Sequence, residues 1–173
     1  MPAGIAIRKM TERDVDEVAR TFAVWRRSRA LYQRYFSEQL MGDRLVLVAW
    51  CGRKAVGYVT VVWESTYEPF RRAGIPEIVD LSVITEYQRR GIGTALIHAA
   101  EDAARQRTCA RIGISVVQSP EYAAANRLYP KLGYVPDGRG ITWYDNELHL
   151  VKTLDGRDAT EGLEGGGETS SGQ

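Results

Sequence analysis

The sequence predicts a mixed α/β (α+β) domain whose central sheet is mainly antiparallel and carries helices on both faces. Three observations predict this fold class. Short β-branched runs and alternating apolar residues indicate strands, whereas other segments repeat their apolar residues at helical spacing. The two kinds of segment follow one another as β-α-α-β-β-β-α-β-α-β. The chain has 173 residues, of which 44% are hydrophobic, and this suffices for one core.

The first part of the chain predicts one strand, two helices and a hairpin. Thr11 is a candidate N-cap, because acidic residues fill the helical turns that follow it. The second helix carries Leu31, Tyr35 and Leu40 on one side and ends at Gly42, a residue that suits a helix C-terminus. The predicted elements are a strand at 5–9, helices at 12–25 and 28–41, and paired strands at 45–50 and 55–63.

The rest of the chain predicts a central strand and further helices and strands after it. Residues 64–74 are expected to form a loop, and the strand at 75–84 is apolar on both faces over much of its length. Pro120 opens a helix that stops at Gly133. The remaining predicted elements are a helix that ends near 107, a strand at 112–117 and a last strand at 143–152.

Charge and composition divide the chain into a domain at 1–154 and a tail at 155–173. The tail holds five acidic residues, one arginine and six glycines, so we expect it to be disordered. The whole chain has a net charge of +1, which argues against a surface built to hold nucleic acid. Without the tail, 22 basic and 17 acidic residues remain, and this modestly basic body suits a polyanionic ligand.

Several other classes of protein are excluded by simple counts. No apolar run approaches the roughly 20 residues that a membrane span needs. The N-terminus shows no secretory signal. Cys51 and Cys109 are predicted to be reduced thiols, because a chain of this length does not need disulfides. We therefore expect a cytoplasmic protein with no membrane partner.

A glycine-rich turn follows the central strand and opens the next helix. It consists of Gln88, Arg89, Arg90, Gly91, Ile92, Gly93 and Thr94. Unpaired amides at a helix start attract anions, and glycines let a phosphate approach the main chain closely. The turn is not a P-loop, since no Gly-Lys-Ser/Thr follows, and Leu96 occupies the third glycine position of the dinucleotide fingerprint. It predicts a pyrophosphate site.

Two blocks of the sequence resemble the GNAT superfamily of N-acetyltransferases. Leu81-Ser82-Val83 and the turn at 88–94 look like the family's acyl-CoA signature, Arg/Gln-x-x-Gly-x-Gly/Ala after a strand. The segment 125–134, ANRLYPKLGY, is similar to its second block, Ala-x-x-Leu-Tyr-x-x-x-Gly-Phe/Tyr. The blocks have the family's order and spacing, and the resemblance covers about residues 4–153. It implies a GNAT-like fold whose central strands splay apart.

The resemblance also implies where acetyl-CoA, the cosubstrate, binds. The amides of 89–94 would hold its pyrophosphate, and the pantetheine arm would lie beside the central strand near Leu81 and Val83. A backbone N–H near Ser82 or Val83 would polarise the thioester carbonyl. Many members carry an asparagine seven residues before the catalytic tyrosine, where this chain has Tyr122. Asn126 is the candidate to replace it, or the contact is absent.

The resemblance assigns an acid and leaves the base open. Tyr129 matches the family's general acid, and the alternative for it is a packed helix aromatic. Asp80 resembles the acid of aminoglycoside 3-N-acetylating members, whereas Glu77 has the spacing of the base in histone-type members. We favour Asp80 by a small margin, with a water relay from either acid also open. Their side chains point to opposite faces unless a bulge intervenes.

Alternatives accompany these assignments. Each acidic candidate could instead form a salt bridge with Arg71, Arg72 or another arginine. His98 and His149 are expected to be structural, and their spacing predicts no metal site.

The acceptor is expected to be the amine of a small molecule or peptide that has an anionic or planar part. The expectation depends on arginines and aromatics in the first two helices, the loop before the central strand and the last hairpin. These are Trp25, Arg26, Arg27, Arg29, Tyr32, Arg34, Tyr35, Tyr67, Phe70, Arg71, Arg72, Trp143 and Tyr144. Two rivals stay open: a transferase with a larger donor such as aminoacyl-tRNA, which would bind RNA, and a non-catalytic CoA-binding domain. A homodimer is compatible with the sequence.

Overall fold

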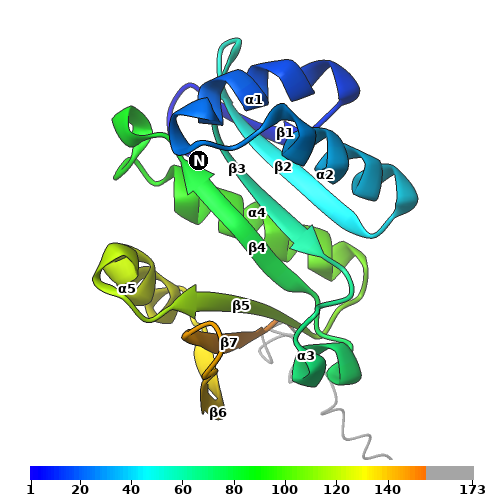
Figure 1. Ribbon diagram of the computed structural model, residues 1–173, viewed down its shortest axis with the longest axis vertical. Helices are drawn as coiled ribbons and strands as arrows, with labels where there is room; N and C mark the ends of the chain where they lie inside the picture. The colour runs from blue at the N-terminus through cyan, green and yellow to red at the C-terminus, as the bar shows by residue number, and fades with distance from the viewer. Residues whose placement is uncertain (155–173) are drawn as a thin grey trace, which may run out of the picture.

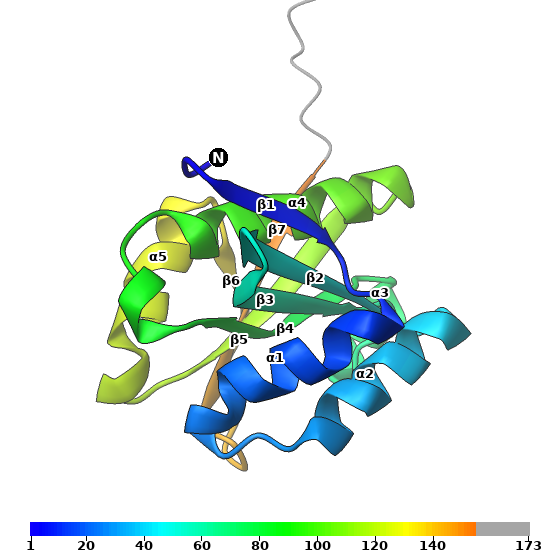
Figure 2. The same cartoon turned by 90° about the horizontal axis from the view of Figure 1, so that it is seen from above.

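The computed structural model describes residues 1–154, which form one seven-stranded sheet with helices on both sides (Figures 1 and 2). The strands are β1 (Ile5–Lys9), β2 (Arg44–Cys51), β3 (Lys54–Val62), β4 (Glu77–Val83), β5 (Arg111–Val117), β6 (Val135–Ile141) and β7 (Glu147–Thr153). They lie in the order β1-β2-β3-β4-β5-β7-β6, and only β4 and β5 are parallel neighbours. The predicted tail at 155–173 lies outside the described residues.

The helices lie on both faces of this sheet. They are α1 (Val15–Phe22), α2 (Arg29–Met41), α3 (Glu68–Ala73), α4 (Ile92–Gln106) and α5 (Ala123–Lys131). Four single turns of 3₁₀-helix accompany them: η1 (Glu12–Asp14), η2 (Ala23–Trp25), η3 (Thr85–Tyr87) and η4 (Pro120–Tyr122). In Figure 2, α1 and α2 cover one face, and α4 covers the other. The predicted mixed sheet with helices on both faces is confirmed.

Two elements differ from the sequence-based expectation. The predicted loop at 64–74 contains the short helix α3, which begins with proline at its first turn. The edge strand β6 was not predicted, because Pro136, Gly138 and Gly140 are typical of turns. Its residues are almost all exposed, so no hydrophobic alternation marks it. The last strand begins at Glu147 rather than at 143, because 142–146 form the turn that joins β6 to β7.

Helix α2 faces the core with a different set of residues than expected. Leu40, predicted on the apolar side, is 72% exposed, so that prediction was wrong. The buried positions are Tyr32, Tyr35 and Gln39, which follow helical spacing. The Gln39 amide donates to the carbonyl of Met10 at 2.8 Å and accepts from a main-chain N–H of β2 at 2.9 Å. A satisfied amide therefore takes the place that periodicity gave to a leucine.

Strands β4 and β5 splay apart, as expected. They pair only at Glu77 with Gly113 and at Ile78 with Ile114, and beyond these pairs they separate (Figure 1). At the joined end, the Phe70 ring of α3 packs against Gly113 so closely that a Cβ there would lie 2.3 Å from it. Glycine at 113 is therefore required, and α3 is fixed over the base of the opening.

Candidate functional site

Strand β4 carries both acidic candidates and contains a bulge at the second one. The register with β3 shifts, so that Asp80 and Leu81 together stand opposite Val59. Asp80 has a left-handed backbone with φ of 58°, which is costly for a residue other than glycine. Such a bulge re-aims side chains. Asp80 consequently faces α2, where it contacts Tyr35, and Glu77, in regular register with β3, faces the same side.

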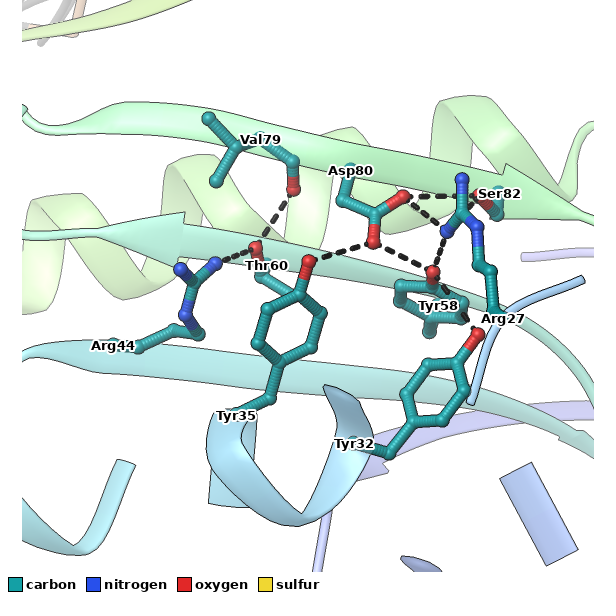
Figure 3. A network of polar contacts seen from close by, with 9 residues as sticks. All are labelled: Arg27, Tyr32, Tyr35, Arg44, Tyr58, Thr60, Val79, Asp80 and Ser82. Carbon is teal, nitrogen blue, oxygen red and sulfur yellow. Dashed lines mark hydrogen bonds and ion pairs between the residues drawn. The ribbon is translucent and has the colours of Figure 1, made fainter. Parts of the chain in front are cut away.

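The Asp80 carboxylate is the centre of a polar network (Figure 3). Its Oδ2 accepts hydrogen bonds from the hydroxyls of Tyr35 at 2.9 Å and Tyr58 at 2.7 Å. Its Oδ1 accepts from the Ser82 hydroxyl at 3.3 Å and from Nη1 of Arg27, with which it forms an ion pair. The Asp80 side chain is only 15% exposed. A carboxylate this buried persists because every oxygen is satisfied.

Neighbouring side chains hold this network in place. Burial, together with the charge of Asp80, raises the pKa of Tyr35 to about 12, so its hydroxyl remains a donor to Asp80 at neutral pH. The guanidinium of Arg44 lies 4.2 Å from the centre of the Tyr35 ring. It also donates to the Thr60 hydroxyl at 2.6 Å. The α2 face of the sheet therefore carries a connected set of polar contacts next to buried apolar side chains such as Phe22 and Val48.

Glu77 lies in a second, more enclosed group of polar side chains. It is buried and accepts a hydrogen bond from Ser65 at 2.5 Å. Nearby, His149 is stacked on the Tyr67 ring at 3.6 Å between centroids, and its Nδ1 has no partner within residues 1–154. Burial lowers the pKa of His149, and burial also raises the pKa of Glu147.

The expected alternative of an ion pair is found at only one of the two acids. Asp80 pairs with Arg27, an arginine from the connection between α1 and α2. Among the described residues, Glu77 has no such pair with Arg71 or Arg72, and Arg72 pairs with Glu68 instead.

The glycine-rich turn presents free main-chain amides. Helix α4 begins after Gly91, which has φ of 81°, and Arg89 also has a positive φ of 59°. Within the described structure, the N–H groups of residues 89–94 make no hydrogen bond. A Cβ at Gly93 would meet no atom within 4 Å, and one at Gly91 would meet only Pro2, at 3.8 Å. The main chain of the turn, which includes Arg90 and Thr94, therefore faces open space with its donors unused, whereas the Ile92 side chain is buried.

The free edge of β4 continues from this turn. The Ile84 N–H donates to the carbonyl of Val56 on β3 at 3.0 Å. Because alternate residues of a strand turn their backbone groups to opposite sides, Val83 directs its N–H and C=O toward the gap beside β5. The side chain of Gln88 donates to that Val83 carbonyl at 2.9 Å, which ties the turn to the strand end. Leu81 lies two residues before Val83 and is part of the bulge.

Helix α5 carries Tyr129 and Asn126. Tyr129 is 6% exposed, and burial raises its pKa to about 12. Its hydroxyl makes no hydrogen bond to any other residue of 1–154. Asn126 donates to the carbonyls of Val117 at 3.2 Å and Tyr122 at 3.0 Å, and it accepts from Gln118 at 2.7 Å. These contacts give Asn126 a structural role, since they hold α5 to the end of β5.

The structure joins some predicted residues and separates others. Asp80 and Ser82 share one network with Arg27 and Tyr35, two of the predicted acceptor-side residues. Two other acceptor-side candidates, Trp143 at 92% and Tyr144 at 64%, are exposed on the turn before β7 and contact each other.

Sequence reasoning missed Tyr58 as a site residue. The alternation of side chains along β3 could have indicated this residue, because Tyr58 and Thr60 must lie on the same face of that strand. Nothing local pairs Arg27 with Asp80, which are 53 residues apart.

Neither a metal centre nor a membrane span is found in the described part of the chain. No three His, Cys, Asp or Glu side chains of residues 1–154 are grouped to hold a metal ion. Every helix there is too short or too polar to span a lipid bilayer. Cys51 and Cys109 are free thiols, as predicted.

Comparison with known proteins gives a family. Residues 12–134 match the sequence model of the acetyltransferase (GNAT) family. No curated protein sequence matches the chain.

Solved structures share the fold. An N-acetyltransferase from Staphylococcus aureus Mu50 aligns over 88% of this chain and 99% of its own, with 14% identity and a TM-score of 0.69. PaiA N-acetyltransferase from Thermoplasma acidophilum, solved with coenzyme A, aligns over 86% and 98%, with 15% identity and a TM-score of 0.64. YncA from Salmonella typhimurium, solved with acetyl-CoA, aligns over 90% and 97%, with 21% identity and a TM-score of 0.68. These similarities confirm the expected GNAT-like architecture.

Proposed function

Because this chain belongs to the GNAT family of acetyltransferases, we propose that it transfers the acetyl group of acetyl-CoA to a primary amine of a small molecule or peptide. One observation carries the proposal: an open amide turn at 89–94 lies at the end of a strand whose edge is free beyond Ile78. Free amides at a helix start suit a pyrophosphate. A free strand edge suits the two amides of a pantetheine arm, which can add to it like a further strand.

The residues of the turn and of β4 divide the work of binding the donor. The amides of Arg89, Arg90, Gly91, Ile92, Gly93 and Thr94 hold the pyrophosphate, and the two arginines add positive charge. Acetyl-CoA supplies the activated thioester. The Val83 N–H points to the gap and stabilises the negative charge that develops on the carbonyl oxygen. Positioning of donor and amine side by side accounts for most of the remaining acceleration.

Tyr129 is the proton donor in this scheme. A pKa of about 12 keeps its phenol protonated throughout the physiological range. Its hydroxyl is not engaged by another described residue, so it is free to donate to sulfur as the carbon–sulfur bond breaks.

The acceptor enters as an ammonium ion and must lose a proton before it attacks. Asp80 and Glu77 both face the α2 side of β4, and we propose Asp80 as the base, with Glu77 as the alternative. Asp80 adjoins Leu81 at the bulge and lies three residues before Val83, whereas Glu77 lies three residues before Asp80 and is held by Ser65. A water relay serves either acid.

A thiol-release assay tests this function. The full chain is incubated with acetyl-CoA and a broad panel of primary amines, and free coenzyme A is measured together with the mass of each acetylated product. We expect release above the hydrolytic background for at least one amine, with a mass gain of one acetyl group. Coenzyme A binding without release for every amine would favour a non-catalytic CoA-binding domain and contradict the proposal.

A further inference from the structure

A single nitrogen of Arg27 contacts three oxygen atoms (Figure 3). Nη1 lies against Oδ1 of Asp80, the Tyr58 hydroxyl and, at 3.2 Å, the Ser82 hydroxyl. The two hydroxyls direct their own protons to the Asp80 carboxylate, at 2.7 Å and 3.3 Å. Both oxygens therefore turn lone pairs toward Nη1. We call these three oxygens the cradle.

The cradle has more acceptors than its present occupant has protons. A guanidinium terminal nitrogen carries two N–H donors, so Nη1 can donate fully to only two of the three oxygens at once, and the Tyr58 oxygen also accepts from the Tyr32 hydroxyl at 3.4 Å. A primary ammonium group carries three N–H donors on one nitrogen. It would satisfy all three oxygens and balance the charge of Asp80, so the cradle fits R–NH₃⁺ better than it fits Arg27.

Arg27 is also the least firmly held member of the network. Its Nε and Nη2 have no partner among the described residues, and in Figure 3 the second terminal nitrogen points away from the cradle. Arg27 comes from the connection between η2 and α2, next to Arg26 in a left-handed conformation, and its side chain is 30% exposed. The oxygens of the cradle, by contrast, come from β3 and β4, in the middle of the sheet.

We propose that the cradle is the seat of the acceptor's ammonium group, and that Arg27 is a resident cation that the acceptor displaces. This inference rests on the proposed function and narrows its acceptor class. The acceptor is a primary amine, because an amine with fewer N–H donors cannot satisfy the cradle. Its body is flat or apolar next to the amine, because the Trp25 ring lies 5.9 Å from the guanidinium carbon of Arg27.

The surface next to Trp25 has room for the body of the acceptor and for the displaced guanidinium of Arg27. A hollow of about 750 Å³ lies between α1 and the segment after β4, and Trp25 forms part of its lining. The same lining contains the acidic Glu17 and Glu86 and the basic Arg20 and Lys54, and Glu17 is paired with Arg20. The hollow can take the body of the acceptor, and Glu86, which has no ion pair within residues 1–154, can receive the guanidinium that leaves Asp80.

Binding of a simple amine tests the proposal without any acetyl transfer. The probe is 2-phenylethylamine, and its N,N,N-trimethyl derivative has the same ring and charge but no N–H donor. Dissociation constants are measured by calorimetry for the parent chain, Arg27→Gln and Arg13→Gln. The last variant removes one positive charge from an exposed position outside the proposed site and is the matched control.

We expect Arg27→Gln to bind 2-phenylethylamine about tenfold more tightly than the parent, because the competing cation is gone. Arg13→Gln should match the parent within about twofold, and the trimethyl derivative should bind every variant at least about tenfold more weakly. Equal affinity of Arg27→Gln and Arg13→Gln, or equal affinity for the two probes, overturns the proposal. Weaker binding by Arg27→Gln also overturns it, since Arg27 would then contact the acceptor directly.

A measurement on the parent chain covers the case in which Arg27→Gln does not fold. The arginine Nε–H signals are recorded by NMR, and the Arg27 signal is assigned by its loss in Arg27→Lys. Addition of 2-phenylethylamine should shift that signal, whereas the trimethyl derivative should not. An unmoved signal contradicts displacement. Loss of the proposed function is distinguishable, because thiol release would then be absent while these binding differences remain.

Discussion

The donor half and the acceptor half of the proposed site are built by different means. The donor half, the turn at 89–94, is one contiguous segment whose main-chain amides are open, although its Ile92 side chain packs in the core. The acceptor half, around Asp80, joins side chains from the α1–α2 connection, α2, β3 and β4 in one buried network. Contacts within the acceptor half therefore stabilise the fold as well as the site, whereas the open amides of the donor half contribute little to stability.

The largest effect is expected at Tyr129, the proposed proton donor. Replacement by phenylalanine keeps the buried ring and removes only the hydroxyl, so kcat should fall by about 10²- to 10³-fold. Coenzyme A affinity and melting temperature should stay close to those of the parent. Tyr122→Phe, at a 46% exposed tyrosine nearby, is the control. Equal turnover by Tyr129→Phe and the parent would remove Tyr129 from its proposed role.

A substitution in the acceptor half should lower the stability of the protein as well as its turnover. Asp80→Asn leaves Arg27 without its counter-charge in a partly buried place, which should lower the free energy of unfolding by about 2 kcal/mol. Asp102→Asn, in an exposed pair with Arg105, should cost less than about 0.5 kcal/mol. Urea unfolding measures both. If the two variants lose the same small amount, the network is not a stabilising element.

A substitution in the donor half should weaken coenzyme A binding without lowering the stability of the protein. Gly93→Ala places a methyl group where the structure has open space and no positive φ, so the helix start tolerates it. The methyl group occupies space that we assign to a phosphate, and coenzyme A affinity should fall about tenfold. The melting temperature should stay the same or rise. His98→Ala, at an exposed position of the same helix, is the control and should leave the coenzyme A affinity measured by calorimetry unchanged. If Gly93→Ala also leaves this affinity unchanged, the turn is not part of the coenzyme A site.

The smallest effect is expected outside both halves, at the pair formed by Arg8 and Asp14. Hydrogen bonds from Arg8 and Thr11 lower the pKa of Asp14 from 3.8 to about 2. The folded state binds this proton less readily than the unfolded state, so the stabilisation is present above about pH 4 and is lost as pH falls toward 2. Asp14→Asn should cost about 1 kcal/mol at pH 7, because Arg8 is partly exposed. Urea unfolding across pH checks that this difference vanishes in acid; a constant difference would contradict the charge-based account.

The same contrast explains what could be predicted from the sequence. Helix starts, the amide turn and the order of most strands depend on neighbours in the chain, so Thr11, Gly91 and Gly93 were informative. The edge strand β6 was missed, because it contributes little to the core and carries no apolar pattern.

Pairings across the sheet were out of reach of the sequence. The sequence indicated only that Asp80 and Glu77 would face opposite sides unless a bulge intervened. It could not place that bulge at Asp80, because a left-handed residue other than glycine has no local sequence signature. Tyr58 and Arg27 meet Asp80 only after β3, β4 and the α1–α2 connection have packed. The roles proposed for Asp80, Glu77 and Tyr129 therefore remain predictions.

The contact of Phe70 with Gly113 has a kinetic consequence. An aromatic ring seated against bare main chain leaves the two parallel strands no freedom to close upon each other or to slide. We therefore expect the opening between them to be present before any ligand binds. A nucleotide-bearing thioester should then bind to a preformed site. Its observed binding rate should rise in proportion to its concentration, without the plateau that a slow opening step would cause.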